Sequence, residues 1–412
     1  MLRYSCKWMA ISVVLSIILG LISSVFLNSL AWVTGFRESN LWIVALLPLA
    51  GFFISWCYDK YGGRASGGNN LLIDTINRGG ERLPWHMAPF VYLGTILTHL
   101  FGGSAGREGT ALQMSASIAD QLTSPFKLSE QERRILLVAS VAGGFGAVFG
   151  TPLAGVVFAL EFSRIGKVNY SAILPALLTA VLSDLFGQLF LASHTHYHID
   201  FVPELSFLGI LYAVIAGVFF GIFAASFSLL MHKLSGLWKS LITWVPLRSF
   251  AGGAVIALAV FLLGSSKYIG LGVPTIVSAF DTQLPFYDFA LKIIFTAVTL
   301  SAGFKGGEVT PLFFIGATLG NALSLFIPLP MGLLAGMGFV AVFSGATNTP
   351  IACTLMAIEL FGADCAVYVA VACVVAYLFS GNTSIYTAQT IGIAKNPLKV
   401  QQQQKSIKDF MG

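Results

Sequence analysis

The sequence predicts an all-α polytopic membrane protein, because it is very apolar and its apolar residues gather in stretches of helical length. Of its 412 residues, 56% are hydrophobic and only 10% are charged, whereas a soluble domain carries about 25% charged residues. So few charges could not cover the surface of a soluble protein of this length, which excludes a soluble enzyme. The apolar excess also excludes a disordered chain. The small net charge of +5 gives no indication of a nucleic-acid partner.

Several apolar stretches approach the roughly 20 residues that a membrane-spanning helix needs. The first, 8–32, is too long for a signal-peptide core and lacks a small-residue cleavage site, so we expect it to be retained. The others lie at 41–57, 172–192, 205–230, 250–264 and 289–302, and the last two are marginal in length. Residues 1–412 are therefore treated as a single membrane domain.

A second set of apolar segments is mostly too short to span a membrane alone, and each is bounded by Gly, Pro, Thr or a charged residue. These segments lie at 110–119, 135–150, 152–161, 311–325, 350–361 and 383–393. Unpaired backbone groups are costly in hydrocarbon, so broken helices persist only where they face protein or a wet cavity. Short, interrupted segments at corresponding places in two halves of a chain indicate the binding site of a transporter.

Lys and Arg gather in certain loops, which the positive-inside rule places in the cytoplasm. These residues are Lys60, Arg64, Arg78, Arg82, Lys127, Arg133, Arg134, Arg164, Lys167, Lys395, Lys399, Lys405 and Lys408. The same rule places the tail, 394–412, inside. The loop 193–204 has no Lys or Arg, so we expect it outside.

Two patterns recur at almost the same offset, which indicates a duplicated membrane unit. The run 104–110 recurs loosely at 305–310, with Glu308 placed 200 positions after Glu108. A Thr-Pro pair with a Glu nine positions after the Pro occurs at 151–161 and again at 349–359, an offset of 350 − 152 = 198. The alternative is that Gly-rich helices beginning with Pro resemble one another in any case. The expected repeats are 35–200 and 205–393, and the alignment leaves open whether they are parallel or inverted.

Glu108 stands beside glycines at the start of a short apolar helix, and this position suggests a functional carboxylate. Helix N-termini hold anions through free N–H groups and a partial positive charge. A carboxylate can occupy such a site itself and leave it when protonated, which would couple anion movement to proton movement. An acidic residue at membrane depth is a functional candidate by default. The alternative is a helix cap at an interface.

The other three acidic residues of the repeated patterns have weaker cases. Glu308 also stands at a helix start, but it could simply neutralise Lys305. Glu161 and Glu359 close their helices, so we expect a structural role for both.

Three stretches in order resemble the CLC family of chloride channels and proton-coupled anion antiporters. They are Gly-Arg-Glu-Gly at 106–109, Gly-Thr-Pro-Leu-Ala-Gly at 150–155 with Glu161, and a Gly followed by Pro four positions later at 307–311. The resemblance implies a CLC-like fold of two inverted repeats of tilted, broken helices, and a homodimer with one pore in each subunit. Glu108 matches the gating glutamate of the family. Tyr386, after Gly-Asn-Thr-Ser-Ile, matches its central tyrosine.

Departures from the chloride-type motifs resemble the fluoride branch of the same family, whose members export fluoride in exchange for protons. Asn69 and Asn70 stand where chloride-type members carry a serine loop, Thr110 closes the Gly-Arg-Glu-Gly run, and Phe162 replaces the inner glutamate. The resemblance implies that Glu108 is the gate. It places on the anion path Gly106, Arg107, Gly109, Thr110, Asn69, Asn70, Glu308, Val309, Thr310, Phe314 and Tyr386.

Fluoride is small and tightly hydrated, so its site must replace water with short, strong donors. The hydroxyls of Thr310 and Tyr386 and backbone N–H groups are such donors. The edge of the Phe314 ring carries positive partial charge and could face an anion. The alternative for Phe314 is simple packing, since the chain holds 34 Phe.

The sequence therefore predicts a proton-coupled fluoride antiporter of a bacterial inner membrane, acting on fluoride and protons. A chloride/proton antiporter or chloride channel on the same fold is the alternative. A membrane-embedded enzyme would need a nucleophile–base pair or metal ligands at membrane depth, and we find none in the sequence. No cofactor and no metal are expected: the five cysteines have no metal-binding spacing, and the loop histidines His194, His196 and His198 lack other ligands.

Overall fold

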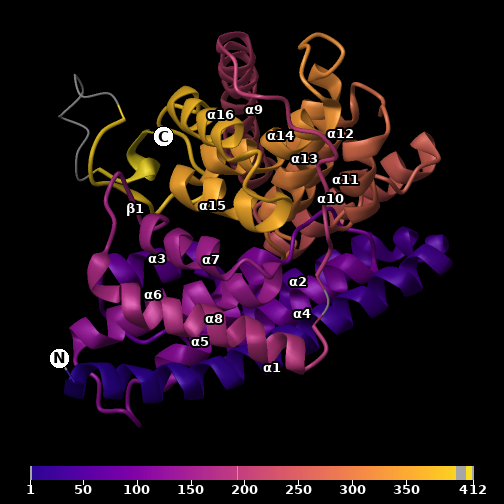
Figure 1. Cartoon of the computed structure of the whole chain (residues 1–412). Helices are drawn as coiled ribbons and strands as arrows, with labels where there is room; N and C mark the ends of the chain where they lie inside the picture. The colour runs from indigo at the N-terminus through magenta and orange to yellow at the C-terminus, as the bar shows by residue number, and fades with distance from the viewer. Residues whose placement is uncertain (1, 193, 396–404, 411–412) are drawn as a thin grey trace.

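The computed structural model describes residues 2–192, 194–395 and 405–410, and this part of the chain is mostly helical, as predicted. Figure 1 shows the helices of the first half of the chain, in indigo to magenta, lying below those of the second half, in rose to yellow. Helix α1 runs along the lower edge, and the two halves meet across the middle of the molecule.

The first half contains eight α-helices joined by short turns. They are α1 (Leu2–Ser39), α2 (Leu47–Cys57), α3 (Gly68–Arg78), α4 (Met87–Leu100), α5 (Glu108–Gln121), α6 (Glu130–Phe149), α7 (Pro152–Glu161) and α8 (Ile173–Leu189). The second half follows with α9 (Phe207–Leu241), α10 (Val245–Leu263), α11 (Val273–Asp281), α12 (Asp288–Ser301), α13 (Val309–Leu323), α14 (Met331–Thr347), α15 (Pro350–Phe361) and α16 (Ala366–Phe379).

Within the described residues, five helical segments are long and apolar enough to cross a membrane. They are Tyr4–Ser39, Leu41–Arg78, Tyr170–Leu189, Phe207–Leu241 and Val245–Leu263. They coincide with five of the six long stretches predicted from the sequence. The sixth, 289–302, forms α12, which has only 14 residues and is shorter than a span. Helices α5, α7, α13 and α15 are also short, with 10 to 15 residues each.

The breaks between helices have the same local cause in both halves. Helix α6 ends at Gly150, whose φ of 70° lies in the left-handed region, and Pro152 starts α7. Helix α14 ends at Asn348 with a φ of 62°, and Pro350 starts α15. Gly and Asn tolerate the left-handed conformation, and Pro suits the first position of a helix because its missing N–H would be unpaired there. The repeated sequence pattern thus encodes a repeated turn.

Helix packing repeats between the halves. Helix α1 packs against α6 and α8 as α9 packs against α14 and α16, and the contact of α5 with α6 corresponds to that of α13 with α14. The expected repeat boundary at residue 35 falls inside α1, which takes part in this pattern. We therefore propose that the first repeat begins with α1 and that the second extends from residue 205 to 393.

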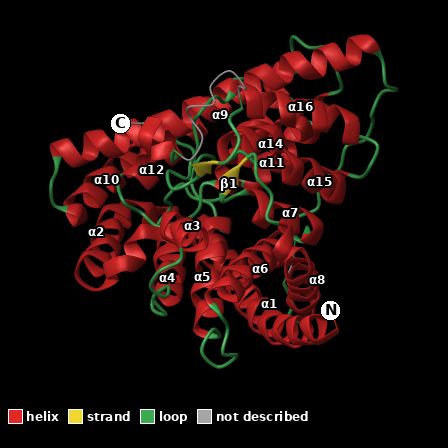
Figure 2. Cartoon of the chain, turned by 90° about the vertical axis from the view of Figure 1, so that its left-hand side faces the viewer, coloured by secondary structure: helices red, strands yellow, loops and turns green. Residues whose placement is uncertain are grey.

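The predicted short apolar segment 383–393 is not a helix. It is an irregular segment that ends in β2 (Thr390–Ile391), which pairs in parallel with β1 (Arg164–Ile165). Figure 2 looks onto the face of the molecule that holds this small sheet. Residues 396–404 of the predicted tail, including Lys399, lie outside the described residues. Ile407 packs back onto Ile165 and Ile391, so this part of the tail is docked.

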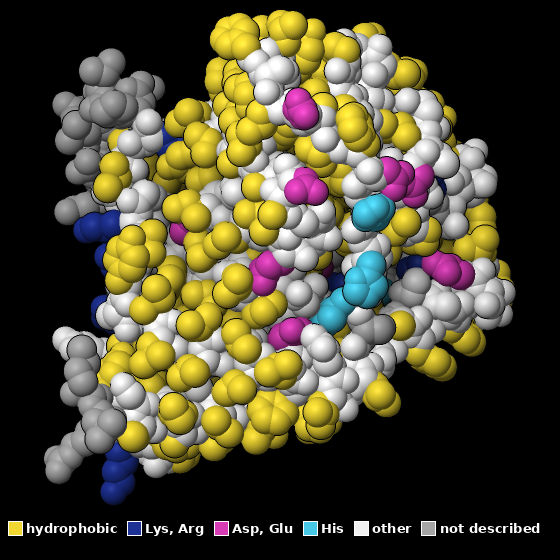
Figure 3. Space-filling view, viewed as in Figure 1, with side chains coloured by type: hydrophobic (Ala, Val, Ile, Leu, Met, Phe, Trp, Pro, Cys, Tyr) yellow, Lys and Arg dark blue, Asp and Glu magenta, His cyan; other side chains and the backbone are white. Residues whose placement is uncertain are grey.

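The surface is consistent with a protein embedded in lipid. Large apolar side chains are exposed on many helices, including Phe207 on α9 and Leu262 on α10. Figure 3 shows apolar side chains over most of the visible face, with most of the visible Lys and Arg at the edge that carries the C-terminus. Acidic and His side chains on this face lie away from that edge.

Candidate functional site

Two glycine loops cross at the centre of the molecule and bring the starts of α5 and α13 together. The N–H of Gly106 donates to the C=O of Gly307 at 2.6 Å, and the N–H of Gly307 donates to the C=O of Gly106 at 2.8 Å. Each loop leads directly into a short helix, α5 from Glu108 and α13 from Val309. The two helix N-termini that the sequence singled out are therefore next to each other.

This crossing requires glycine. A Cβ on Gly307 would lie 2.7 Å from the backbone N of Gly109 and 3.3 Å from that of Glu108. A Cβ on Gly106 would lie 2.9 Å from Glu108 Oε2. The first contact is with backbone, which cannot move aside like the end of a side chain, so the loops can approach this closely only without side chains.

The Glu108 carboxylate occupies the N-terminus of the opposite helix. The side chain is buried, with 1% of its surface exposed. Its Oε1 accepts a hydrogen bond from Thr310 Oγ1 at 2.5 Å, and its Oε2 accepts from the backbone N–H groups of Thr310 and Arg107, both at 3.1 Å. Free N–H groups and the helix dipole stabilise an anion at this position. The carboxylate thus fills a site that is built for an anion.

A polar cavity of about 170 Å³ lies beside the crossing, with Gly306 and Glu308 in its wall. Asn69, Glu308 and Tyr386 line it, and each exposes a buried polar atom without a hydrogen-bond partner in the structure: Asn69 Oδ1, Glu308 Oε2 and the Tyr386 hydroxyl. Buried polar atoms normally have a partner, so such groups around a cavity of this size fit water or a polar ligand. We call it the inner cavity.

Lys305 also lines the inner cavity. Its ammonium lies 4.1 Å from the centroid of the Tyr58 ring, a cation–π contact, rather than against Glu308. The interpretation of Glu308 as a simple counter-ion for Lys305 therefore lacks support.

A much smaller cavity of about 20 Å³ has Glu108 in its wall. We call it the outer cavity. Its walls also include Arg107 and Thr310 from the crossing, and Thr195 and Tyr197 from the loop between α8 and α9. The crossing therefore has two spaces beside it, one lined by Glu108 and the other by Glu308.

The remaining predicted path residues have more ordinary surroundings. The Thr110 hydroxyl is paired with that of Thr95 at 2.6 Å, which joins α5 to α4. Val309 is buried and lines neither cavity. Phe314 also lines neither cavity, and its ring lies 5.1 Å from the ammonium of Lys292. Gly109 packs at the crossing itself, where Asn69 approaches it.

Asn70, unlike its neighbour Asn69, has its side-chain oxygen in a hydrogen bond. Its Oδ1 accepts a hydrogen bond from the backbone N–H of Ala388 at 2.9 Å, which ties the start of α3 to the segment that carries Tyr386. Phe162, which replaces the family's inner glutamate, is fully buried, and its ring meets that of Tyr386 edge to face, with 6.3 Å between centroids.

Gln389 holds the Tyr386 segment, and no sequence pattern singled it out. It is fully buried. Its amide donates to the carbonyls of Phe162 at 2.6 Å and Thr347 at 2.7 Å. Its oxygen accepts from Asn348 Nδ2 at 3.1 Å and from Ser384 Oγ at 2.7 Å. This one side chain therefore connects the ends of α7 and α14 to the segment before β2.

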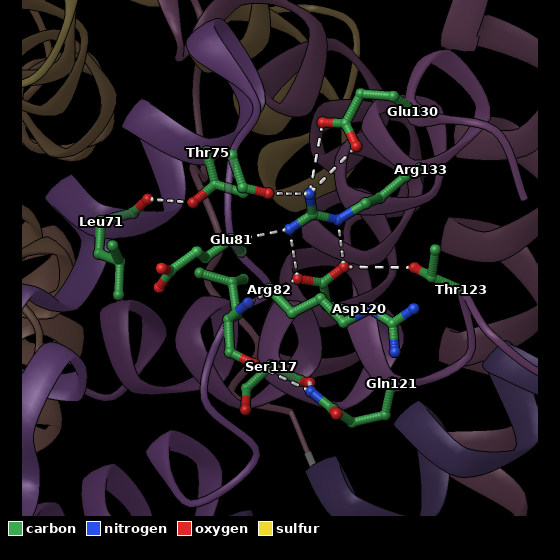
Figure 4. Close-up of polar contacts among 12 residues, drawn as sticks. Leu71, Thr75, Glu81, Arg82, Ser117, Asp120, Gln121, Thr123, Glu130 and Arg133 are labelled. Carbon is green, nitrogen blue, oxygen red and sulfur yellow. Dashed lines mark hydrogen bonds and ion pairs between the residues drawn. The ribbon is translucent and has the colours of Figure 1, made fainter.

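A second buried network lies at the far ends of α5 and α6 (Figure 4). Arg133 donates two hydrogen bonds to Asp120, at 2.6 and 2.8 Å, and two more to the carbonyls of Gly80 and Glu81. Asp120 also accepts from the backbone N–H of Leu83 at 2.7 Å. Arg133 was expected in a cytoplasmic loop, but it lies in the first turn of α6 and is 3% exposed. Its charge is thus used to fix the α3–α4 turn.

Glu161 and Glu359 cap each other's helices. Glu359 accepts hydrogen bonds from the N–H groups of Leu153 and Ala154 at the start of α7. Glu161 accepts from the N–H of Ala352 at the start of α15, at 3.0 Å. Each carboxylate satisfies helix N-terminal donors that would otherwise be unpaired, which fits the structural role expected for both.

The loop histidines do not converge. His194 is 3.5 Å from Asp184, while the exposed His198 is 3.5 Å from Asp200. No group of three or more His, Cys, Asp or Glu side chains in the described part of the chain is arranged to hold a metal ion.

Comparisons with known proteins agree on one family. The model of the voltage gated chloride channel family matches residues 50–381. A protein of Pseudomonas syringae pv. tomato named "Chloride/fluoride channel protein" is 47% identical over 418 residues, covering 100% of this chain and 92% of its own. The crystal structure of a CLC-type fluoride/proton antiporter superposes with a TM-score of 0.90 at 35% identity, covering 93% of this chain and 97% of that one. The structure of a slow cyanobacterial Cl⁻/H⁺ antiporter, 19% identical, gives a TM-score of 0.79 over 91% of this chain and 94% of its own, and shows the fold alone.

Proposed function

Because the chain belongs to the voltage gated chloride channel, or CLC, family, we propose that it is a proton-coupled antiporter that exports fluoride across a bacterial inner membrane. The fold is that of the family, two inverted repeats of tilted, broken helices in an integral membrane protein. The observation that carries the proposal is the position of the Glu108 carboxylate, which is bound as an anion at the N-terminus of α13 and lines the outer cavity, while Glu308 lines the inner one.

Glu108 is the gate and the proton carrier in this proposal. While it is charged, the carboxylate holds the anion position through three hydrogen bonds. Protonation removes the charge that the α13 N-terminus stabilises, and the side chain then leaves the position. A fluoride ion then takes its place and accepts hydrogen bonds from the N–H and hydroxyl of Thr310. Because the carboxylate leaves only when it is protonated, this exchange of carboxylate for fluoride couples fluoride movement to proton movement.

The preference for fluoride rests on the relatives and on the donors in the site. The Pseudomonas relative carries fluoride in its name, and the structure with 35% identity is that of a fluoride/proton antiporter. The inner cavity offers the Tyr386 hydroxyl without a partner. A tightly hydrated anion needs strong donors of this kind to replace its water.

Glu308 is the second polar group of the path. The family's inner proton-handling glutamate is replaced here by the apolar Phe162, so protons must reach Glu108 in another way. Glu308 lines the inner cavity and has a free oxygen there. We propose that the hydrated inner cavity, with Glu308 in its wall, conducts protons between the cytoplasm and Glu108.

Orientation and assembly complete the proposal. The edge rich in Lys and Arg faces the cytoplasm and places the C-terminus inside. The family resemblance adds a homodimer in which each subunit has its own path.

A chloride/proton antiporter or a chloride channel is the second candidate, because the name of the Pseudomonas relative includes chloride. Flux measurements separate the candidates. The purified protein is reconstituted into liposomes loaded with fluoride or with chloride, and efflux is followed with ion-selective electrodes with and without an inward proton gradient. The proposal expects proton-stimulated fluoride efflux well above chloride efflux. Equal fluxes would favour the second candidate, and fluoride flux indifferent to protons would exclude antiport.

A further inference from the structure

The outer cavity is a separate feature of the path, and its size limits what it can hold. It has a volume of about 20 Å³ and lies directly against Glu108. A cavity needs about 10–15 Å³ to hold one water molecule. A bare fluoride ion is about the size of a water molecule, whereas chloride is larger. In this state the space next to the gate therefore fits a single particle of that size.

Part of the wall of this cavity comes from the loop between α8 and α9, which the sequence marked by its lack of Lys and Arg and by its histidines. Thr195 and Tyr197 of this loop line the cavity opposite Glu108. Thr195 and Tyr197 are two residues apart in the loop, and both line the cavity together with Glu108. Each brings a hydroxyl group to the side chains that form its wall.

The Tyr197 ring is held in place by aromatic rings from three helices. Its centroid lies 5.8 Å from that of Phe280 on α11, 5.1 Å from that of Phe339 on α14 and 6.3 Å from that of Phe361 on α15. Edge-to-face contacts of this kind are favourable beyond simple burial. Packed aromatic rings yield little to a larger neighbour, because interiors are dense and respond to added volume with strain.

The cavity combines few donors with apolar walls. Arg107 Nε is buried, has no hydrogen-bond partner in the described residues and lies 3.6 Å from Glu108 Oε1. With the hydroxyls of Thr195 and Tyr197 it supplies donors to an anion. Much of the remaining wall is apolar, with Phe149 and Phe313 among its members. An anion must shed water to enter, and only these donors replace that water.

We propose that Tyr197, with Thr195, forms an outer binding site for a single dehydrated fluoride ion and sets the upper size limit for the anion released past Glu108. The inference rests on the proposed function and adds to it a specificity-determining residue outside the motifs that the sequence analysis singled out. Arg107 and the two hydroxyls are the donors of this site, and the aromatic packing of Tyr197 fixes its width.

Two substitutions of Tyr197 separate the effect of the cavity's width from the effect of its hydroxyl donor. Tyr197→Ala removes the ring and widens the cavity, so chloride efflux should rise at least about fivefold relative to fluoride efflux. Tyr197→Phe keeps the ring and removes the hydroxyl, so fluoride efflux should fall about tenfold, with the chloride-to-fluoride ratio within twofold of wild type. His198→Ala, in the same loop but exposed and away from the cavity, is the matched control and should change neither quantity.

The measurement compares fluoride, chloride and bromide efflux from liposomes for each variant, after size-exclusion chromatography has shown the protein to be monodisperse. A Tyr197→Ala ratio within twofold of wild type overturns the inference. If this variant does not fold, Tyr197→Leu replaces it with the same expectation, because it also opens the ring position. If the wild type moves chloride as fast as fluoride, the proposed fluoride function fails. Tyr197→Ala should then still raise bromide efflux relative to the efflux of the smaller anions. An unchanged order among the three anions would then overturn the size limit independently.

Discussion

Gly106 and Gly307 bond to each other through both of their backbone amide groups, although 307 − 106 = 201 positions separate them in the sequence. Each belongs to a loop that opens a short helix, and the two loops come from different halves of the chain. Their pairing brings the start of α5 to the start of α13, so a carboxylate on one helix can reach the N-terminus of the other. In the proposed duplication, the two copies of one loop supply both the proposed gate and the site that it occupies.

The crossing makes a prediction for Gly307→Ala. The new Cβ would lie 2.7 Å from the backbone N of Gly109, a contact that only movement of the backbone can relieve. We expect loss of fluoride efflux and a lower thermal unfolding temperature, measured on protein in detergent. Gly236→Ala is the control, because Gly236 lies in α9 with nothing within 4 Å of an added Cβ. Ala is the better helix former by about 1 kcal/mol, so this variant should be neutral or slightly stabilised. Full activity of Gly307→Ala would contradict the close crossing.

Glu108→Gln tests the gate. Glutamine keeps the size of the side chain and one of the two acceptor oxygens, but its NH2 group cannot accept the second hydrogen bond from Thr310, and it cannot bind and release a proton at neutral pH. An inward proton gradient should therefore no longer accelerate fluoride efflux, and fluoride efflux should no longer carry protons inward. The measurement records fluoride with an electrode and protons with a pH electrode in the same liposomes. Glu204→Gln, an exposed position in the loop before α9, should retain the coupling of the wild type. A proton-to-fluoride ratio unchanged in Glu108→Gln would remove Glu108 from this role.

The features that follow local rules could be predicted from the sequence. The long apolar helices follow from hydropathy, the breaks before α7 and α15 follow from Gly, Asn and Pro, and the likeness of the two glycine loops follows from their spacing. The segment 383–393 could not be predicted correctly, because its apolar residues suggested a helix. In the structure its backbone groups are instead satisfied by distant partners, such as Asn70 for the N–H of Ala388 and β1 for β2.

Dependence on distant partners also explains why the sequence did not reveal the roles of Arg133 and Tyr197. Arg133 counted as one more positive charge beside the membrane, yet its position is set by Asp120 and by carbonyls of the α3–α4 turn. Tyr197 lies in a loop with no motif, and only the packing of three other helices directs it toward Glu108. Contacts between residues far apart in the sequence leave no periodic pattern, so a single sequence does not reveal them.

Asp120→Asn is expected to destabilise the protein strongly. The substitution removes the buried charge that pairs with Arg133 and leaves that guanidinium with only the half-exposed carboxylate of Glu130, at 3.3 Å. Breaking a buried ion pair in this way costs about 3–5 kcal/mol. Thermal unfolding in detergent, followed by intrinsic fluorescence, should show a clearly lower midpoint. Glu81→Gln removes the exposed ion pair with Arg64 and should have little effect, because exposed pairs contribute little. Equal midpoints for the two variants would show that the network in Figure 4 carries no stability.

Gln389→Met is expected to change fluoride binding in addition to stability. Methionine fills a similar volume but makes none of the four hydrogen bonds of Gln389, so the carbonyls of Phe162 and Thr347 lose their donor. Unpaired buried groups cost about 1–3 kcal/mol each, and the segment that carries Tyr386 loses its anchor. Since Tyr386 lines the inner cavity, the KM for fluoride should rise by about tenfold or more.

The control for this variant is Gln121→Met. Gln121 is also partly buried and donates to two backbone carbonyls, those of Leu83 and Ser117, but it lies at the far end of α5 from the site. It should lower the unfolding midpoint without changing the KM. The difference between the two variants therefore separates a positioning role from a structural one, because general loss of stability reduces the amount of active protein and leaves the KM of the survivors unchanged. If Gln389→Met unfolded earlier but kept the fluoride KM of the wild type, Gln389 would hold the chain together without placing Tyr386.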